Sequence, residues 1–249
     1  MQPTKTLLPF LALSSFLLLS PSSDLSAQTC TPEAKFVYVE GLDETGNTKY
    51  AEDTGDSFEG SAPVEATFTA NPSDYDGYSA RFEWRIYQTD DTTNVLVHRF
   101  DEEIQYTFSK SGSYTVELKA TFQSADDLVE YSSREEDASI SVTISESHLE
   151  MPNAFSPNGD GINDLYKAKS NHKSIVEFHA YIFNRYGQKL YDWTDINGGW
   201  DGTSHGSPVK DGVYFVYVKA RGADNVEYNI RRDVNLLRNF NELENGNGK

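Results

Sequence analysis

Stretches in which apolar and polar residues alternate run through most of this chain, and they restrict it to β-structure. The clearest stretches are residues 64–70, 81–87, 113–120 and 138–144. Successive side chains of a strand point to opposite faces, so the alternation predicts strands with one face in a core and the other in water. Turn-forming clusters separate the stretches, and no comparable helical period occurs. The sequence therefore predicts an all-β fold, with a β-sandwich within residues 33–146.

The C-terminal part of the chain has strand patterns of a second kind. Residues 176–183 are apolar at odd and even positions, residues 184–187 form a turn signal, and residues 188–193 follow as a hairpin partner. Residues 212–219 and 228–236 continue the pattern. Apolar residues on both faces predict strands that are packed on both sides. We therefore expect a second β-domain in tandem with the first.

Charge divides the chain into two unlike halves. Residues 1–150 contain 9 Lys and Arg against 27 Asp and Glu, a net charge of −18, whereas residues 151–249 contain 12 of each kind. The acidic half argues against nucleic acid and against an anionic lipid surface as partners. Its acids are scattered, which favours a solvated surface over binding of divalent cations. The change in charge predicts a domain boundary at a linker over residues 147–151.

The N-terminus has the pattern of a secretory signal peptide, which we assign to residues 1–27. Lys5 precedes an apolar run at residues 7–19, and small residues at 25–27 precede a cut ahead of Gln28. The run is shorter than the roughly 20 residues that span a bilayer, so an uncleaved anchor is the less favoured alternative. The sequence predicts an exported mature chain without a transmembrane span.

Cys30 is the only cysteine, so the chain can form no internal disulfide. Each domain then depends on a packed hydrophobic core for its stability. A lipid anchor at Cys30 is disfavoured, because Thr29 stands where lipidation signals have a small residue.

Residues 62–144 resemble a PKD-type domain, an immunoglobulin-like sandwich found in surface proteins. The resemblance depends on Trp84 and on the segment 106–118, in which Gly112, Tyr114 and Val116 stand at the family's positions. The segment Arg85-Ile86-Tyr87-Gln88 departs from the family, which has Asp-Phe-Gly-Asp-Gly after the tryptophan. The resemblance implies a spacer or binding module over residues 33–146.

Residues 152–238 resemble the type B C-terminal sorting domain of type IX secretion, also called the gliding motility-associated C-terminal domain. Five blocks occur in family order, at residues 152–164, 182–191, 200–202, 211–214 and 233–237. The residues that carry the resemblance are Pro152, Asn153, Phe155, Ser156, Pro157, Asn158, Gly159, Asp160, Gly161, Asn163, Asp164, Asn184, Gly187, Trp200, Asp201, Gly202, Asp211, Gly212 and Tyr214. The polar residues 239–249 that follow are expected to be a disordered tail.

Together with the signal-peptide pattern, the two resemblances imply two tandem immunoglobulin-like β-sandwich domains after a cleaved signal peptide. It also implies export through the periplasm and across the outer membrane, to the cell surface or the medium. The implied partners are the type IX secretion translocon and its outer-membrane shuttle components.

In the first block, oxygen-bearing side chains alternate with glycines, as in short calcium-binding loops. The candidate ligands are Asn158, Asp160 and Asp164. Aligned on the usual twelve-residue loop, however, its last position is Lys167, which cannot supply a carboxylate. The favoured alternative is a tight turn in which Gly159 and Gly161 have positive φ. Calcium-dependent melting would support the metal site, and an unchanged melting temperature would dismiss it.

No catalytic motif occurs, and no cofactor other than calcium is suggested. The five histidines have no metal-ligand spacing, and no nucleophile elbow or phosphate-binding glycine loop is present. We expect a non-catalytic protein that binds an unknown surface protein or serves as a spacer. The alternatives are a glycan-binding protein, with Tyr75, Tyr78 and Tyr87 as exposed aromatics, and an adhesin or gliding-associated surface protein.

Overall fold

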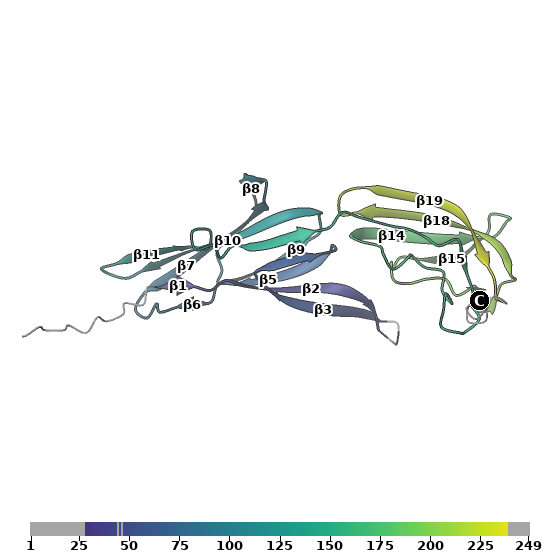
Figure 1. Ribbon diagram of the computed structural model, residues 1–249, viewed down its shortest axis with the longest axis horizontal. Helices are drawn as coiled ribbons and strands as arrows, with labels where there is room; N and C mark the ends of the chain where they lie inside the picture. Colours follow the sequence, from purple (N-terminus) through teal and green to yellow (C-terminus); the bar gives the residue numbers. More distant parts are fainter. Residues whose placement is uncertain (1–27, 44, 46, 239–249) are drawn as a thin grey trace, which may run out of the picture.

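The structure is a computed structural model that describes residues 28–43, 45 and 47–238. The predicted signal peptide and the predicted tail lie outside these residues. The described chain is all-β, and Figure 1 shows two β-domains arranged end to end. No helix with the length and apolar character to cross a membrane occurs in the described ranges.

The first domain contains the strands β1 to β12. They are β1 (Thr29–Cys30), β2 (Glu33–Leu42), β3 (Thr48–Gly55), β4 (Ser57–Gly60), β5 (Val64–Thr69), β6 (Pro72–Ser73), β7 (Ser79–Gln88), β8 (Asp91–Arg99), β9 (Glu103–Phe108), β10 (Gly112–Gln123), β11 (Leu128–Ser132) and β12 (Ile140–Ile144). One sheet has the order β3-β2-β5-β9. The other large sheet has the order β4-β12-β10-β7-β8, with β11 also paired to β10, and β1 pairs separately with β6. Both sheets contribute to one core, which makes the domain a sandwich.

The core of the first domain follows the predicted alternation. Phe82, Trp84 and Ile86 of β7 are buried, and so is every second residue of β5 and β12. Phe68 of one sheet and Trp84 of the other lie with ring centres 6.0 Å apart, so the tryptophan joins the two layers. Its indole N–H donates to the Asp101 carbonyl at 3.1 Å, which satisfies the one polar atom of a fully buried side chain.

The prediction that Tyr87 is exposed is wrong, because only 4% of its surface is accessible. Tyr87 lies on the same face of β7 as Arg85, and the pairing of Arg85 with Glu117 of β10 places that buried carboxylate on this face, beside Tyr87. The Tyr87 hydroxyl donates to the buried carboxylate of Glu117, which Arg134 also approaches at 3.3 Å. These polar contacts compensate for the burial of the hydroxyl and the carboxylate.

The second domain contains the strands β13 to β19. They are β13 (Ala154–Phe155), β14 (Ile175–Phe183), β15 (Lys189–Trp193), β16 (Thr203–Ser204), β17 (Ser207–Pro208), β18 (Gly212–Gly222) and β19 (Glu227–Leu236). The main sheet has the order β13-β19-β18-β14-β15, and β16 pairs with β17 in a small second sheet. The predicted hairpin of β14 and β15 is confirmed.

The core of the second domain lies on one face of its main sheet only. Tyr166 and Trp200, from long loops, are fully buried against that face. On the other face Val213 and Phe215 are 50% and 45% exposed. The prediction that these strands are packed on both sides is therefore wrong, because the loops and the small sheet supply only one covering layer.

Residues 147–151, which we predicted as a linker, pack into the second domain. Leu149 and Met151 belong to its core, and His148 forms a β-bridge with Lys173. The chain therefore passes from one domain to the other over very few residues, and most of the predicted linker is packed against the second domain.

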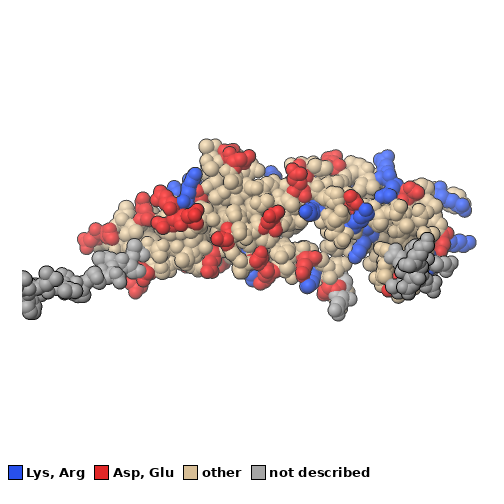
Figure 2. Space-filling model, in the orientation of Figure 1, with Lys and Arg blue, Asp and Glu red and all other residues tan. Residues whose placement is uncertain are grey.

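The two domains meet through defined hydrogen bonds. The Ser174 hydroxyl accepts a bond of 3.1 Å from the Ala62 N–H, and the Ala223 carbonyl accepts one of 3.1 Å from the Ser111 N–H. Ala223 of the second domain is 3% exposed and packs into the core of the first. Figure 2 shows acidic side chains spread over the first domain, whereas lysines and arginines gather on the second.

Candidate functional site

The five sequence blocks of the second domain meet at the end that points away from the first domain. β14 and β18 pair from Ile175 with Gly222, next to the domain junction, to Phe183 with Phe215 at the opposite end. We call this opposite end the distal end. It contains the loop 156–164, the turn 184–188, residues 200–202, residues 209–212 and residues 237–238.

Arg238 connects several of these segments. Its guanidinium donates to the carbonyls of Val209 at 2.6 Å and Gly202 at 2.9 Å, and to the Asp211 carboxylate at 2.8 Å. Its backbone N–H donates to the other Asp211 oxygen at 3.0 Å. A planar guanidinium can satisfy several acceptors at once, so this side chain joins its own segment, 237–238, to the segments 200–202 and 209–212. A Cβ on Gly202 would lie 3.0 Å from this guanidinium and 3.1 Å from Pro157, so glycine suits that position.

Trp200 is the centre of the core beneath the distal end. It is fully buried, and its ring centre lies 5.3 Å from that of Phe155 and 5.2 Å from that of Tyr214. Its indole N–H donates to the Thr203 carbonyl at 2.6 Å, and Asp201 accepts from the Thr203 N–H at 2.9 Å. The Trp-Asp-Gly block therefore combines a core ring with the turn that positions it.

The loop 156–164 is built around the carboxylate of Asp164. One oxygen accepts from the N–H groups of Asn158 at 2.9 Å and Gly159 at 2.8 Å, and the other accepts from Gly161 at 2.8 Å. Gly159 and Gly161 have φ of 81° and 84°, as the tight-turn interpretation predicts. The backbone N–H groups, that of Gly159 foremost, hold the pKa of Asp164 below its usual value.

The same hydrogen bonds bear on the calcium hypothesis. Asp160 accepts from the Ile162 N–H at 2.9 Å and from the Asn158 side-chain amide at 3.0 Å, so both proposed carboxylates accept bonds within the loop. Among the described residues, no group of three or more His, Cys, Asp or Glu side chains is placed to hold a metal ion. This arrangement fits a turn better than a calcium site, and calcium binding by Asn158, Asp160 and Asp164 stays a prediction.

Replacing Asp164 by asparagine is expected to open this loop at pH 7. The N–H groups of Gly159 and Gly161 should exchange with solvent severalfold faster, since an amide has one acceptor oxygen and no charge. Because the folded pKa is depressed, the carboxylate stabilises the loop above its ordinary pKa of 3.8 and loses this effect as pH falls through the lower folded value. The two proteins should therefore become alike in acid. Asp126→Asn, an exposed change in the first domain, is the control; equal exchange at pH 7 in the Asp164 variant would contradict the prediction.

The remaining motif residues also have structural positions at this end. The Asn184 side chain accepts from the N–H groups of Tyr186 at 2.9 Å and Gln188 at 3.0 Å, and Gly187 has φ of 79°. The Tyr214 hydroxyl donates to the Lys210 carbonyl at 2.6 Å. These residues hold turns in a fixed conformation. The motif therefore consists of turn-forming residues and of the buried aromatic rings that support them.

Two residues of this end were missed by the sequence reasoning. Tyr166 is fully buried and donates to the Pro152 carbonyl at 3.0 Å, although it lies just outside the first block. Arg238 follows the last block, and a single arginine there has no periodicity or spacing that singles it out. The only sequence feature that could have drawn attention to Arg238 is its position directly after a strand end that is otherwise apolar.

The aromatic residues proposed for glycan binding do not form an exposed platform. Tyr75 is 37% exposed and lies beside Phe122, and the Tyr78 hydroxyl donates to Asp127 at 2.9 Å. Tyr87 is buried, as described above.

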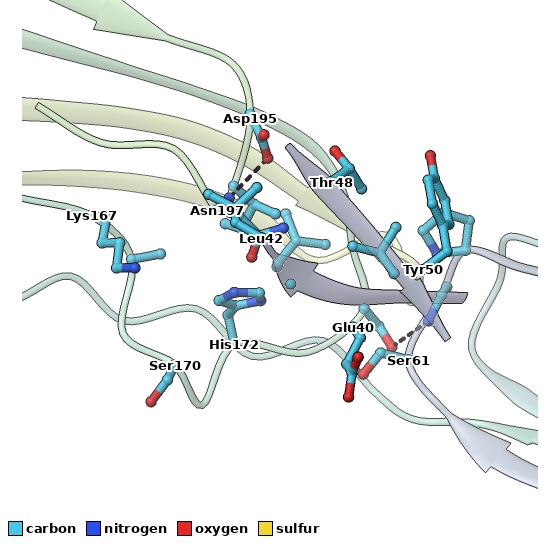
Figure 3. Close-up of a pocket in the computed structure, with 18 residues that line it drawn as sticks. Glu40, Leu42, Thr48, Tyr50, Ser61, Lys167, Ser170, His172, Asp195 and Asn197 are labelled. Carbon is cyan, nitrogen blue, oxygen red and sulfur yellow. Dashed lines mark hydrogen bonds between the residues drawn. The ribbon is translucent and has the colours of Figure 1, made fainter. Parts of the chain in front are cut away.

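A cavity of about 620 Å³ lies where the β2–β3 hairpin approaches loops of the second domain. Leu42 and Tyr50 of the first domain and His172, Asp195 and Asn197 of the second line it, and Figure 3 labels them. Burial lowers the pKa of His172. None of the sequence-predicted site residues lines this cavity, so the motif and the cavity are separate features.

The fold and the distal end define a small β-domain whose motif residues build turns and their supporting core. Residues 149–230 match the CHU_C Type IX secretion signal domain. The predicted sorting domain is therefore confirmed as a type IX secretion signal over these residues. The protein is exported across the outer membrane to the cell surface or the extracellular space.

Solved structures give weaker similarities. Dimeric latent PorU from Porphyromonas gingivalis is 12% identical with a TM-score of 0.25, over 86% of this chain and 20% of that one. A tetra-tandem repeat from the extending region of a large adhesion protein is 14% identical with a TM-score of 0.26, over 84% and 68%. The glucan-utilization protein SGBP-B of Bacteroides ovatus, solved with a mixed-linkage heptasaccharide, is 13% identical with a TM-score of 0.23, over 73% and 42%.

This chain thus spans a fifth of the PorU chain, and scores this low support no functional inference. A comparison with curated proteins finds no match.

Proposed function

We propose that this is a non-catalytic surface protein in which residues 152–238 are the export signal and residues 33–146 are the exported module. The observation that carries the proposal is the convergence of five separate sequence blocks at the distal end of a domain that matches a secretion signal. Turns held in fixed geometry give an export apparatus a constant feature to recognise, whatever module precedes them.

The first domain is proposed to act as an interaction or spacer module, as its PKD-like pattern suggests. Its acidic, solvated surface suits a protein that must stay soluble outside the cell. Adhesion or a gliding-associated role would be ways of using such a module. Glycan binding through Tyr75, Tyr78 and Tyr87 has lost its main support, because Tyr87 is buried.

Deleting residues 152–238 is expected to leave the first domain in the periplasm, because the apparatus then has nothing to recognise. The measurement is the distribution of the protein between periplasm, cell surface and medium. The matched control joins residues 1–27 and 147–238 to an unrelated folded reporter, which should be exported. A truncated protein that still reaches the surface or the medium would refute the proposal.

A further inference from the structure

The main sheet of the second domain has an aromatic face that the described residues leave open. In β14 the buried residues alternate with Tyr181 and Phe183, and in β18 they alternate with Val213, Phe215 and Tyr217. Tyr181 is paired with Tyr217 and Phe183 with Phe215, so these side chains lie next to one another on the same side of the sheet. We call this group of five residues the outer aromatic face.

A sheet face in water normally carries mostly polar residues, whereas this one has a contiguous group of five apolar and aromatic side chains with polar residues beside it. Val213 is 50% exposed and Phe215 is 45% exposed, as neighbours rather than as scattered single residues. A shallow hollow of about 650 Å³ lies over Phe183, Val213, Phe215 and Tyr217. Contiguous exposed apolar groups with a polar rim are typical of binding surfaces.

The rings of this face hold one another in place. His179 and Tyr181 stack with ring centres 4.1 Å apart, and Tyr181 and Tyr217 lie 6.1 Å apart at 22°. His179 is held from both sides, by the Tyr181 hydroxyl at 2.9 Å and by Asp192 at 3.0 Å. A partner would therefore meet preorganised side chains, which lowers the entropic cost of binding.

Two cations border the same rings. The guanidinium carbon of Arg231 lies 4.9 Å from the Tyr217 ring centre, and the Lys219 ammonium lies 5.7 Å from it. Within the described part of the chain neither cation has an ion pair, although Arg221 pairs with Glu177 nearby. Asp233 lies across from Phe215 and is the acidic group of the hollow.

We propose that the outer aromatic face, with Arg231 and Lys219, docks a protein surface that presents carboxylates beside apolar side chains. The unpaired cations give the charge complementarity, and the exposed rings give the apolar area. We place this surface on an outer-membrane component of the export machinery, because the face belongs to the secretion-signal domain. In this respect the inference rests on the proposed function.

A glycan is the less suitable occupant of this face. Sugars stack on open ring faces, but His179 and Tyr181 cover each other, and Arg231 covers a face of Tyr217. What remains open is the side of Phe215 and Val213 together with the two cations. That combination suits aliphatic and acidic side chains of a protein.

The test uses the full chain with Val213→Ser, Phe215→Ser and Arg231→Glu combined. All three side chains are exposed, so the melting temperature should stay close to that of the parent protein. Export should fall roughly tenfold or more, because aromatic and arginine side chains dominate the energetics of interfaces. The matched control combines Val226→Ser, Leu128→Ser and Lys173→Glu, whose side chains are similarly exposed but lie off the face.

A photo-crosslinking residue at position 215, with one at position 226 as its control, identifies the occupant in exporting cells. A protein adduct in the outer membrane from position 215 only, together with the loss of export, supports the proposal. A glycan adduct, or an adduct with a second copy of this chain, overturns it. Normal export of the face variant also overturns it, and so does an equal loss in the control variant.

The deletion of residues 152–238 distinguishes a failure of the docking surface from a failure of the proposed function. If the deletion blocks export but the face variant is exported normally, the proposed function holds and the docking surface is wrong. If the deleted chain is still exported, the proposed function fails and the docking surface fails with it.

Discussion

Replacing Trp200 by alanine is expected to destabilise the second domain by about 3–5 kcal/mol and to abolish export, since a fully buried tryptophan leaves a large cavity. Phe155 and Tyr214 would lose their central neighbour. The Thr203 carbonyl would also lose the indole N–H that it accepts. Urea unfolding measures the first effect, and fractionation of the cells measures the second.

Two further variants separate the contributions of Trp200. Trp200→Phe keeps an aromatic ring but removes the indole donor, so its loss of stability should be smaller than that of the alanine variant. Val226→Ala, at an exposed turn of the same domain, should change stability by less than about 0.5 kcal/mol. If the alanine variant were as stable as the Val226 control, Trp200 would not be the centre of this core.

Replacing Trp84 by alanine is expected to destabilise the first domain by a similar ~3–5 kcal/mol while the export signal stays intact. Trp84 is fully buried, lies against Phe68 of the facing sheet, and donates to the Asp101 carbonyl. Urea unfolding should therefore show an earlier transition for the first domain. In cells, the fraction of the remaining protein that is exported should exceed that of the Trp200 variant.

The comparison of the two tryptophan variants is informative because the changes are chemically the same. Phe100→Ala, 65% exposed in the first domain, serves as the stability control. If the Trp84 variant were retained in the periplasm as fully as the Trp200 variant, export would depend on the stability of the whole chain. The assignment of the signal to the second domain would then lose its basis.

Regular local patterns made much of the fold predictable. In β7, β10 and β12 the apolar face named from the alternation is the buried face. The β14–β15 hairpin followed from a turn signal between two strand patterns. Each of these predictions depends on residues close together in sequence, where the geometry of a strand or turn leaves few choices.

The wrong predictions concern burial by segments distant in sequence. Tyr87 is covered because the neighbouring strand β10 places the buried Glu117 on the same face of the sheet, where it accepts from the Tyr87 hydroxyl. Val213 and Phe215 are exposed because the second domain has only one covering layer on its main sheet. Neither the contact with Glu117 nor the absence of a second layer can be inferred from the local pattern of residues.

For the candidate site, the sequence alone determined which blocks are present, their order, and the tight turn at Gly159 and Gly161. It also determined the division of charge, since that needs only a count along the chain. The tertiary structure alone decided that the blocks meet at the distal end, that Arg238 joins them, and that an aromatic face stays open on the sheet. The physical reason is that strand alternation and turn formation are local, whereas such contacts depend on how the sheets and loops pack.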